Sequence, residues 1–156
     1  AIPVIYRKAI GNRIYGCDDC QLVCPWNKYA EVTEEKDFFA RQHMHNRSLL
    51  DLFKWTEDEF LEHTEGSAIR RIGYRKWKRN IAVGLGNQIV KSIEEAENIK
   101  SVLQNALDFP DDMVQEHIRW ALAEIEQCEL QLGKKSVNRK TLSLARSVEK
   151  GMPRHG

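Results

Sequence analysis

The chain has 156 residues, of which 42% are hydrophobic and 30% charged, and its net charge is +1. This is the composition of a soluble globular protein, and no apolar run approaches the roughly 20 residues that are needed to span a bilayer. No signal-peptide pattern opens the chain. Because it begins Ala-Ile-Pro without an initiator Met, we expect a fragment whose N-terminal part is missing.

The near-neutral total conceals strong segregation of charge along the chain. Residues 1–66 are net −4, residues 67–91 carry 7 basic and no acidic side chains, residues 92–132 are net −8 and residues 133–156 are net +6. Overall charge therefore says nothing about partners, while a local basic segment can bind a polyanion.

The N-terminal third contains one short helix and a cysteine motif. Pro3 suits the first turn of a helix over residues 2–10, and Gly11 ends it. The motif spans residues 16–27 and finishes with Pro25. Residues 27–47 are polar without a clear period, which predicts a surface connection with one short helical turn.

From residue 48 the pattern predicts helices to the end of the chain. Thr56 with Glu59, and Ser92 with Glu95, have the spacing of capping boxes, and Ser67 and Asp111 are further candidate caps. The predicted helices cover residues 74–87, 93–106, 112–132 and 138–150, the third ending at Gly133. Their apolar stripes carry the following residues: Trp77, Ile81, Leu85, Ile93, Ala96, Ile99, Leu103, Ala106, Val114, Ile118, Ala121, Leu122, Ile125, Leu142, Ala145 and Val148. No segment has the pattern of a strand, so we expect a mostly α fold of stacked hairpins of the HEAT-like α-solenoid type.

Cys17, Cys20 and Cys24 follow the spacing C-x2-C-x3-C-P. Bacterial-type ferredoxins use C-x2-C-x2-C-x3-C-P, whose last cysteine ligates the other of two [4Fe–4S] clusters. The position of the first cysteine in that run is Ile14 here. This spacing predicts that Cys17 and Cys20 bind one cluster and Cys24 a second, with the remaining thiolates supplied from outside the chain.

Two other interpretations of the cysteines stay open. A zinc site could join the three thiols with His43 or His45, although the C-x3-C-P end suits zinc poorly. The cysteines could also be inert structural residues. Cys128 lies three residues after Ile125 on an apolar stripe, where a free cysteine packs as a small hydrophobe, and His117 on the same stripe is expected to be a satisfied buried histidine.

A basic segment covers residues 67–79. It contains Arg70, Arg71, Arg75, Lys76, Lys78 and Arg79, and the positions of Arg75, Lys78 and Arg79 predict a shared helix face. Clustered Arg and Lys without acidic neighbours favour phosphate binding, and the alternative is a solvated face balanced by acidic helices. A second basic stretch (Lys134, Lys135, Arg139 and Lys140) is predicted to be a tail. Glu57, Asp58 and Glu62 are interpreted as helix-capping acids.

Two blocks of the sequence resemble one known family. Residues 10–27, which place Ile-Tyr-Gly before the cysteines and Trp-Asn after them, look like the second cluster motif of epoxyqueuosine reductases. Residues 66–83, followed by Leu85-Gly-Asn87, resemble the start of that family's HEAT-like domain. The blocks cover about a quarter of the chain, and their order and separation also match.

The resemblance implies a fold and a function. It implies residues 1–30 as the end of a ferredoxin-like domain with two [4Fe–4S] clusters, 31–47 as a connection, and 48–156 as a HEAT-like tRNA-binding domain. It also implies a cytoplasmic, monomeric oxidoreductase that reduces epoxyqueuosine to queuosine in tRNA, with a low-potential donor and clusters feeding electrons to cobalamin. Asp18 and Asp19 would lie near the cobalamin, and Arg70, Arg71, Arg75, Lys78 and Arg79 would contact RNA.

Some parts of the family pattern lie outside this sequence. The cobalamin domain, the first cluster motif and the family's general acid are absent, so the chain alone is expected to be inactive. Two other functions remain candidates on the residues alone: a ferredoxin-like electron carrier fused to a helical protein-interaction domain, and a HEAT scaffold whose cysteines bind zinc.

Overall fold

The fold is built of helices throughout the part that the structure covers. The structure is a computed structural model and describes residues 1–35, 44 and 46–151. Within these ranges it contains no strand, and the elements follow in the order α1 (Val4–Ile10), α2 (Asp19–Leu22), η1 (Pro25–Tyr29), α3 (Leu49–Lys54), α4 (Glu57–His63), η3 (Ala68–Ile72), α5 (Tyr74–Gly86), α6 (Ile93–Gln104) and α7 (Asp112–Gly151). The expectation of a mostly α chain is confirmed.

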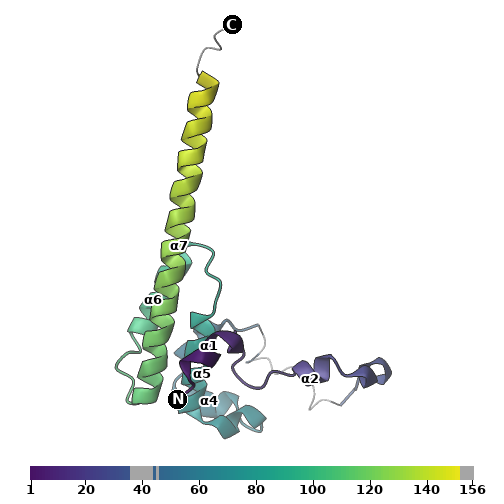
Figure 1. Cartoon of the computed structure of the whole chain (residues 1–156). Coiled ribbons are helices and arrows are strands. Elements are labelled where there is room, and N and C mark those ends of the chain that lie inside the picture. The colour runs from purple at the N-terminus through teal and green to yellow at the C-terminus, as the bar shows by residue number, and fades with distance from the viewer. Residues whose placement is uncertain (36–43, 45, 152–156) are drawn as a thin grey trace.

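Helix α5 forms the centre of the helical body. It packs against α7, α3, α4, η3 and α1, while α6 packs on α7 and α3 (Figure 1). The predicted apolar stripe, in which Trp77, Ile81 and Leu85 recur every four residues, is fully buried. Burying such large apolar side chains contributes about 1.5–3 kcal/mol each, so this helix anchors the fold.

The helix boundaries follow the predicted capping residues in most places. Thr56 and Glu59 form a reciprocal capping box at α4, Ser67 accepts a hydrogen bond from the Ile69 N–H, and Asp111 accepts one from the Val114 N–H. The Ser92 hydroxyl caps α6, but Glu95 accepts from the Lys91 N–H instead of closing a box with Ser92. The Ser92 capping-box prediction was therefore half right.

The C-terminal prediction of two helices was wrong. Helix α7 runs without a break from Asp112 to Gly151, through Gly133, and its second half extends beyond the other helices (Figure 1). A Cβ built on Gly133 meets nothing within 4 Å. Glycine lowers helix stability by only about 1 kcal/mol relative to alanine, so the flanking helix formers carry the helix through it.

Most of the predicted core residues are buried. Val114, Ile118, Ala121 and Ile125 are fully buried, and Cys128 packs at the edge of the same core. Ile93 was expected on the buried stripe of α6 but is 49% exposed, because it sits at the first turn of that helix. None of the helices in the ranges described is both long and apolar enough to cross a membrane.

Candidate cluster ligands and nucleic-acid surface

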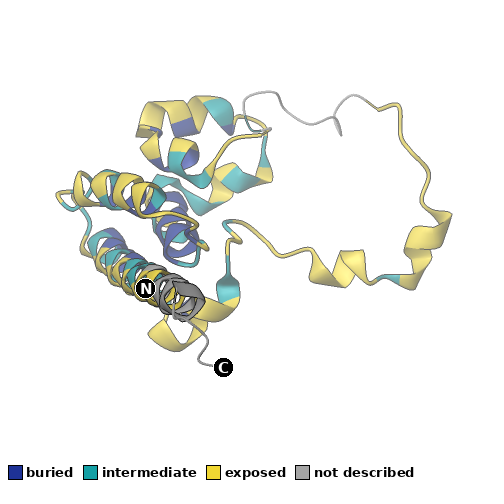
Figure 2. Cartoon of the chain, turned by 90° about the horizontal axis from the view of Figure 1, so that it is seen from above, coloured by how far each residue is buried: buried dark blue, intermediate teal, exposed yellow. Residues whose placement is uncertain are grey.

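The three clustered cysteines lie on an arm, residues 15–35, that extends away from the helical body (Figure 2). Gly16 and Asp18 both adopt positive φ, and the Asp18 carbonyl accepts hydrogen bonds from the Gln21 and Leu22 N–H groups. These features turn the chain tightly between Cys17 and Cys20. Both of these thiols are free and exposed.

Cys24 occupies a different position on the arm. It is the residue before η1, with Pro25 directly after it, and its N–H donates to the Gln21 carbonyl at 3.1 Å. The Asn27 side-chain amide donates to the same carbonyl at 2.6 Å, which holds η1 against α2. Among the described residues no three His, Cys, Asp or Glu side chains gather as a metal site, and His43 and His45 of the zinc alternative lie outside those residues.

The two acids between the cysteines have different surroundings. Both oxygens of Asp19 accept from the Arg13 guanidinium at 3.0 Å, and this ion pair is exposed to solvent on both sides. It therefore orients α2 but contributes under about 1 kcal/mol. Asp18 is an exposed residue in the left-handed region. A role for either acid at cobalamin stays a prediction.

The arm displays a group of large apolar side chains to solvent. Leu22, Val23, Trp26, Tyr29 and Val32 are all at least 64% exposed. Single exposed apolar residues are ordinary, but five of them within eleven positions of one thin segment are typical of a surface that binds another polypeptide. The apolar residues lie close to all three thiols in sequence. A polypeptide that covered the apolar side chains would therefore also cover the thiols.

Residues 1–14 fasten the arm to the helical body. The Asn87 amide donates to the carbonyls of Arg7 and Gly11, and the Asn80 amide donates to the Ile14 carbonyl at 2.7 Å. Asn80 on α5 and Asn87, the residue directly after that helix, are seven residues apart, which places them two turns apart on one face. Sequence reasoning missed this pair, although that spacing was available in the residues that carry the family resemblance.

His117 contributes to the same attachment. Its Nε2 accepts from the Ile2 N–H at 3.0 Å, while its Nδ1 lies 2.6 Å from the Met113 carbonyl. Burial is the main cause of its lowered pKa, so the ring is neutral near pH 7. The prediction of a satisfied buried histidine is confirmed. Beside it, the buried Arg7 pairs with Glu116 and donates to the Ile2 carbonyl.

The basic segment divides into exposed and buried residues. Arg70, Arg71, Arg75 and Lys76 are exposed on η3 and on the first turn of α5. Arg75 forms an ion pair with Asp111, whose side chain is only 6% exposed. The other three exposed cations have no ion pair with any described carboxylate, and they leave their charge available to a polyanion.

Lys78 does not lie on that exposed surface, contrary to the expectation of a face shared with Arg75. Its side chain is 7% exposed, and its ammonium donates to the Phe53 carbonyl and lies over the rings of Phe53 and Tyr74. Position 78, next to Trp77, is an apolar one in this fold. The stem of Lys78 packs inside, and its ammonium is satisfied there by the Phe53 carbonyl. Lys78 therefore supports the packing of the helical body, and its ammonium does not face a phosphate on the surface.

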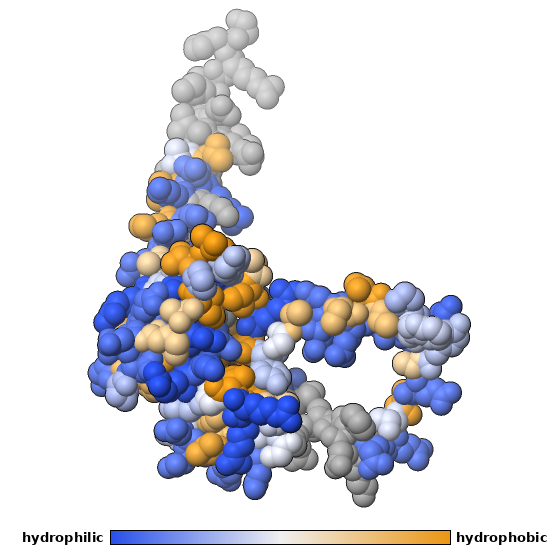
Figure 3. All heavy atoms as spheres, turned by 60° about the horizontal axis from the view of Figure 1, so that its bottom comes forward, coloured by the Kyte–Doolittle hydropathy of each residue, from blue (hydrophilic) through white to orange (hydrophobic). Residues whose placement is uncertain are grey.

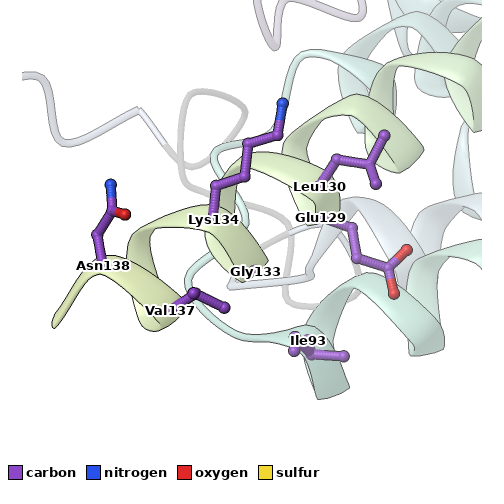
Figure 4. Close-up of a pocket in the computed structure, with 7 residues that line it drawn as sticks. All are labelled: Ile93, Glu129, Leu130, Gly133, Lys134, Val137 and Asn138. Carbon is purple, nitrogen blue, oxygen red and sulfur yellow. The ribbon is translucent and has the colours of Figure 1, made fainter. Parts of the chain in front are cut away.

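The middle of α7 borders a hollow of about 820 Å³ (Figure 4). Ile93, Leu130 and Val137 give it apolar walls, and Lys134 and Asn138 line it as well. Sequence reasoning missed this hollow because a helix broken at Gly133 would not have continued past Ile93. Figure 3 shows orange, apolar side chains on the helical body near the base of the protruding helix, and others along the arm.

The class that these features define is a helical protein that carries a thiol-rich arm and an exposed basic segment. Along 99% of its length the chain is 50% identical to an epoxyqueuosine reductase of Shewanella oneidensis, of which it covers 37%. It is 48% identical to that of Escherichia coli and 46% identical to that of Salmonella typhimurium, again over 99% of the chain and 39% and 38% of the relatives.

The chain belongs to the epoxyqueuosine reductase family and spans less than two fifths of the length of these relatives. No family model matches it. No solved structure matches it either. The family assignment made on the two sequence blocks is thus confirmed by alignment over nearly the whole chain.

Proposed function

We propose that this chain is part of an enzyme that reduces epoxyqueuosine to queuosine in tRNA, and that it contributes cluster ligands and an RNA-binding helical body. The observation that carries the proposal is the similarity to the reductases over 99% of the chain, the cysteine motif included. Because the chain spans 37% of that relative, the activity is proposed for the full-length protein.

The cysteines suit iron–sulfur ligation in their chemistry and in their placement. Thiolates are the ligands that iron–sulfur clusters prefer, and Cys17 and Cys20 share one tight turn while Cys24 starts the next helical turn. In the proposal Cys17 and Cys20 are ligands of one [4Fe–4S] cluster, and Cys24 is a ligand of another. The clusters would supply electrons, one at a time, to a cobalamin held mainly by other parts of the protein, with Asp18 and Asp19 nearby.

The exposed apolar side chains of the arm support this assembly. A ferredoxin-like domain completed by another segment of the same protein would cover Leu22, Val23 and Trp26 and exclude water from the clusters. The Arg13–Asp19 ion pair and the Asn27 amide would hold the thiols in place before that segment docks. The low-potential donor, a monomeric state and a cytoplasmic site of reaction follow from the family and belong to the proposal.

The helical body suits tRNA binding. We propose that α5, α6 and α7 form HEAT-like packed hairpins and that Arg70, Arg71 and Arg75 contact phosphates, with Lys76 beside them. Guanidinium groups grip phosphate through paired donors, and residues 67–91 contain no acid that would repel RNA. Arg79 lies deeper and is considered below.

Metal analysis of the full-length protein tests the redox part of the proposal. Anaerobically purified protein is expected to contain iron and acid-labile sulfide near eight each per chain, as two [4Fe–4S] clusters require, and cobalamin. Electron paramagnetic resonance would report the reduced clusters and Co(II) in the same sample. Zinc without iron would sink the redox assignment and favour the zinc-binding scaffold, while iron without cobalamin would favour a ferredoxin-like carrier.

A further inference from the structure

A hollow of about 450 Å³ lies where the arm leaves the helical body. Its walls come from both parts: Tyr15 and Cys17 on the arm with Arg13 just before it, and Ile72, Arg79 and Asn80 on η3 and α5. Two of these residues are cations, and one is a predicted cluster ligand. The hollow therefore connects the base of the cysteine arm to the two elements that carry the exposed arginines.

Arg79 is a half-buried cation without a counterion among the described residues. Its Nε and Nη2 donate to the Asn80 side-chain oxygen at 3.0 and 2.8 Å, and its Nη1 lies 3.9 Å from the Met113 sulfur. Burial, with no compensating charge, lowers its pKa from the ordinary value. A guanidinium in partial burial with only neutral partners is costly, so an anion that enters the hollow would be stabilised.

Three acids among the described residues pair with other arginines. Asp19 pairs with Arg13, Asp111 pairs with Arg75, and Glu116 pairs with Arg7. Each of these arginines thus has an internal acid, while Arg79 has none among the residues described. The Arg79 charge is left for a ligand, and Arg13, whose exposed ion pair with Asp19 is weak, lies at the rim as a second guanidinium.

Asn80 joins the two sides of the hollow. Its oxygen accepts from Arg79, and its amide donates to the Ile14 carbonyl, three residues before Cys17. A ligand that pulls on the Arg79 guanidinium therefore acts on the same side chain that holds the arm. A ligand in the hollow would therefore act, through Asn80 and Ile14, on the segment that leads to Cys17.

Resting on the proposed function, we propose that this hollow binds a phosphodiester group through Arg79 and Arg13, next to the cysteine arm. The RNA backbone is the source that the surroundings favour, because the exposed Arg70, Arg71 and Arg75 lie on the same two elements as Ile72 and Arg79. A phosphodiester of bound cobalamin has the same chemistry and is distinguished by experiment. This phosphodiester site would lie beside a proposed cluster ligand, Cys17, and is more specific than a general basic surface.

The test uses the full-length protein with Arg79→Gln, and Arg119→Gln as the matched control. Arg119 is exposed on α7 and, among the described residues, its side chain bonds to Gln115 alone, so its loss removes the same charge away from the hollow. Affinity for labelled total bacterial tRNA is measured by anisotropy across a salt titration. Retention of cobalamin after desalting is measured by absorbance on the same samples.

Arg79→Gln is expected to weaken tRNA binding about tenfold and to reduce the salt slope by about one, while Arg119→Gln changes neither. A loss of cobalamin retention with unchanged tRNA affinity would support the site and identify the cofactor as the source. If both readouts stay at wild-type values while Arg70→Ala/Arg71→Ala weakens tRNA binding, the site is refuted and the proposed function stands. If none of the variants alters tRNA binding, the RNA-binding part of the proposed function fails with it.

A variant that does not fold is recognised from its far-ultraviolet circular dichroism. In that case Arg79→Lys replaces Arg79→Gln, because a lysine keeps the charge but lacks the paired donors that grip an oxyanion. This variant is expected to lose part of the affinity. Wild-type affinity and wild-type cobalamin retention in a folded Arg79→Lys protein would overturn the inference.

Discussion

At the scale of single residues, Lys78 carries a measurable cost of burial. Its ammonium lies among Phe53, Tyr74 and the Phe53 carbonyl, and desolvation lowers its pKa from 10.5 to about 8, with only partial compensation from Glu59. Below pH 8 the lysine is protonated in both the folded and the unfolded chain, so the full cost applies. Between about pH 8 and 10.5 the unfolded chain binds more protons, so the free energy of unfolding rises with pH.

Replacing Lys78 is predicted to flatten this pH dependence. The free energy of unfolding of the wild-type chain should gain about 2 kcal/mol from Lys78 between pH 7.5 and 9.5, since each pKa unit corresponds to about 1.4 kcal/mol. Lys78→Met should lack that gain. Urea unfolding at the two pH values measures this difference. Burial raises the pKa of Tyr74 to about 12, which lowers the free energy of unfolding only at pH values above this range.

Lys76→Met is the control for this comparison. Lys76 is exposed on the same helix, so its replacement removes the same charge without relieving any burial. The control should keep the wild-type slope. An equal slope in Lys78→Met and wild type would show that the buried ammonium does not titrate in this window.

The residues themselves explain why sequence reasoning succeeded at some sites and failed at others. The buried positions of Trp77 and His117 and the capping role of Asp111 follow from local patterns, and all three were predicted correctly. Lys78 was misplaced because a long amphipathic side chain can reach either solvent or an internal carbonyl, and the choice depends on α3, which is distant in sequence. The contacts of Asn80 and Asn87 with the first fourteen residues likewise required the tertiary packing.

At the scale of elements, two glycines show what helix packing requires. A Cβ on Gly86 would lie 2.8 Å from Trp120 Cζ3 and 2.9 Å from the Ala121 Cα, so this glycine allows α5 and α7 to approach closely. A Cβ on Gly133 would meet nothing within 4 Å. Gly86 ends α5 and Gly133 lies inside α7, and only Gly86 has a packing reason.

The two Gly→Ala variants are therefore predicted to have opposite effects. Gly133→Ala should raise the free energy of unfolding by about 0.5–1 kcal/mol, the difference between the two residues in a helix. Gly86→Ala should lower it by about 1–3 kcal/mol through overpacking. Urea unfolding followed by circular dichroism measures both, and a stabilised Gly86→Ala would contradict the close approach of the two helices.

The elements also show the limits of local signals. Caps at Thr56, Ser67 and Asp111 were predicted because each depends on neighbours within three residues. The break expected at Gly133 was wrong, because a glycine stops a helix only where the backbone turns to positive φ, and Gly133 does not. A stop signal of this kind needs a second local cue, such as the proline that follows Asp108 and Phe109 at the end of the preceding hairpin.

At the scale of the whole molecule, the proposed division of ligands between two clusters makes a prediction for the cysteines. In the anaerobically purified full-length protein, Cys17→Ala and Cys24→Ala should each lose about half of the bound iron, and the double variant should lose nearly all. Cys128→Ala, at the edge of the helical core, is the control and should retain all of it. Complete loss of iron in each single variant would argue against two independent clusters.

The basic surface makes a separate prediction. Arg70→Ala/Arg71→Ala in the full-length protein should weaken tRNA binding and make its salt dependence shallower. With fewer phosphate contacts, binding releases fewer counterions from the RNA. These two residues are preferred over Arg75, whose removal would also leave the buried Asp111 without its ion pair. Binding that stays unchanged across a salt titration would exclude the surface as a phosphate footprint.

The length of α7 has a consequence for how the molecule melts. Its 40 residues correspond to a rod of about 60 Å, and the last part stands clear of α5 and α6 (Figure 1). A free helical stretch shorter than about 15 residues is marginal in water. On warming, ellipticity at 222 nm should first decline gradually as this end frays, and the cooperative collapse of the helical body should follow at higher temperature.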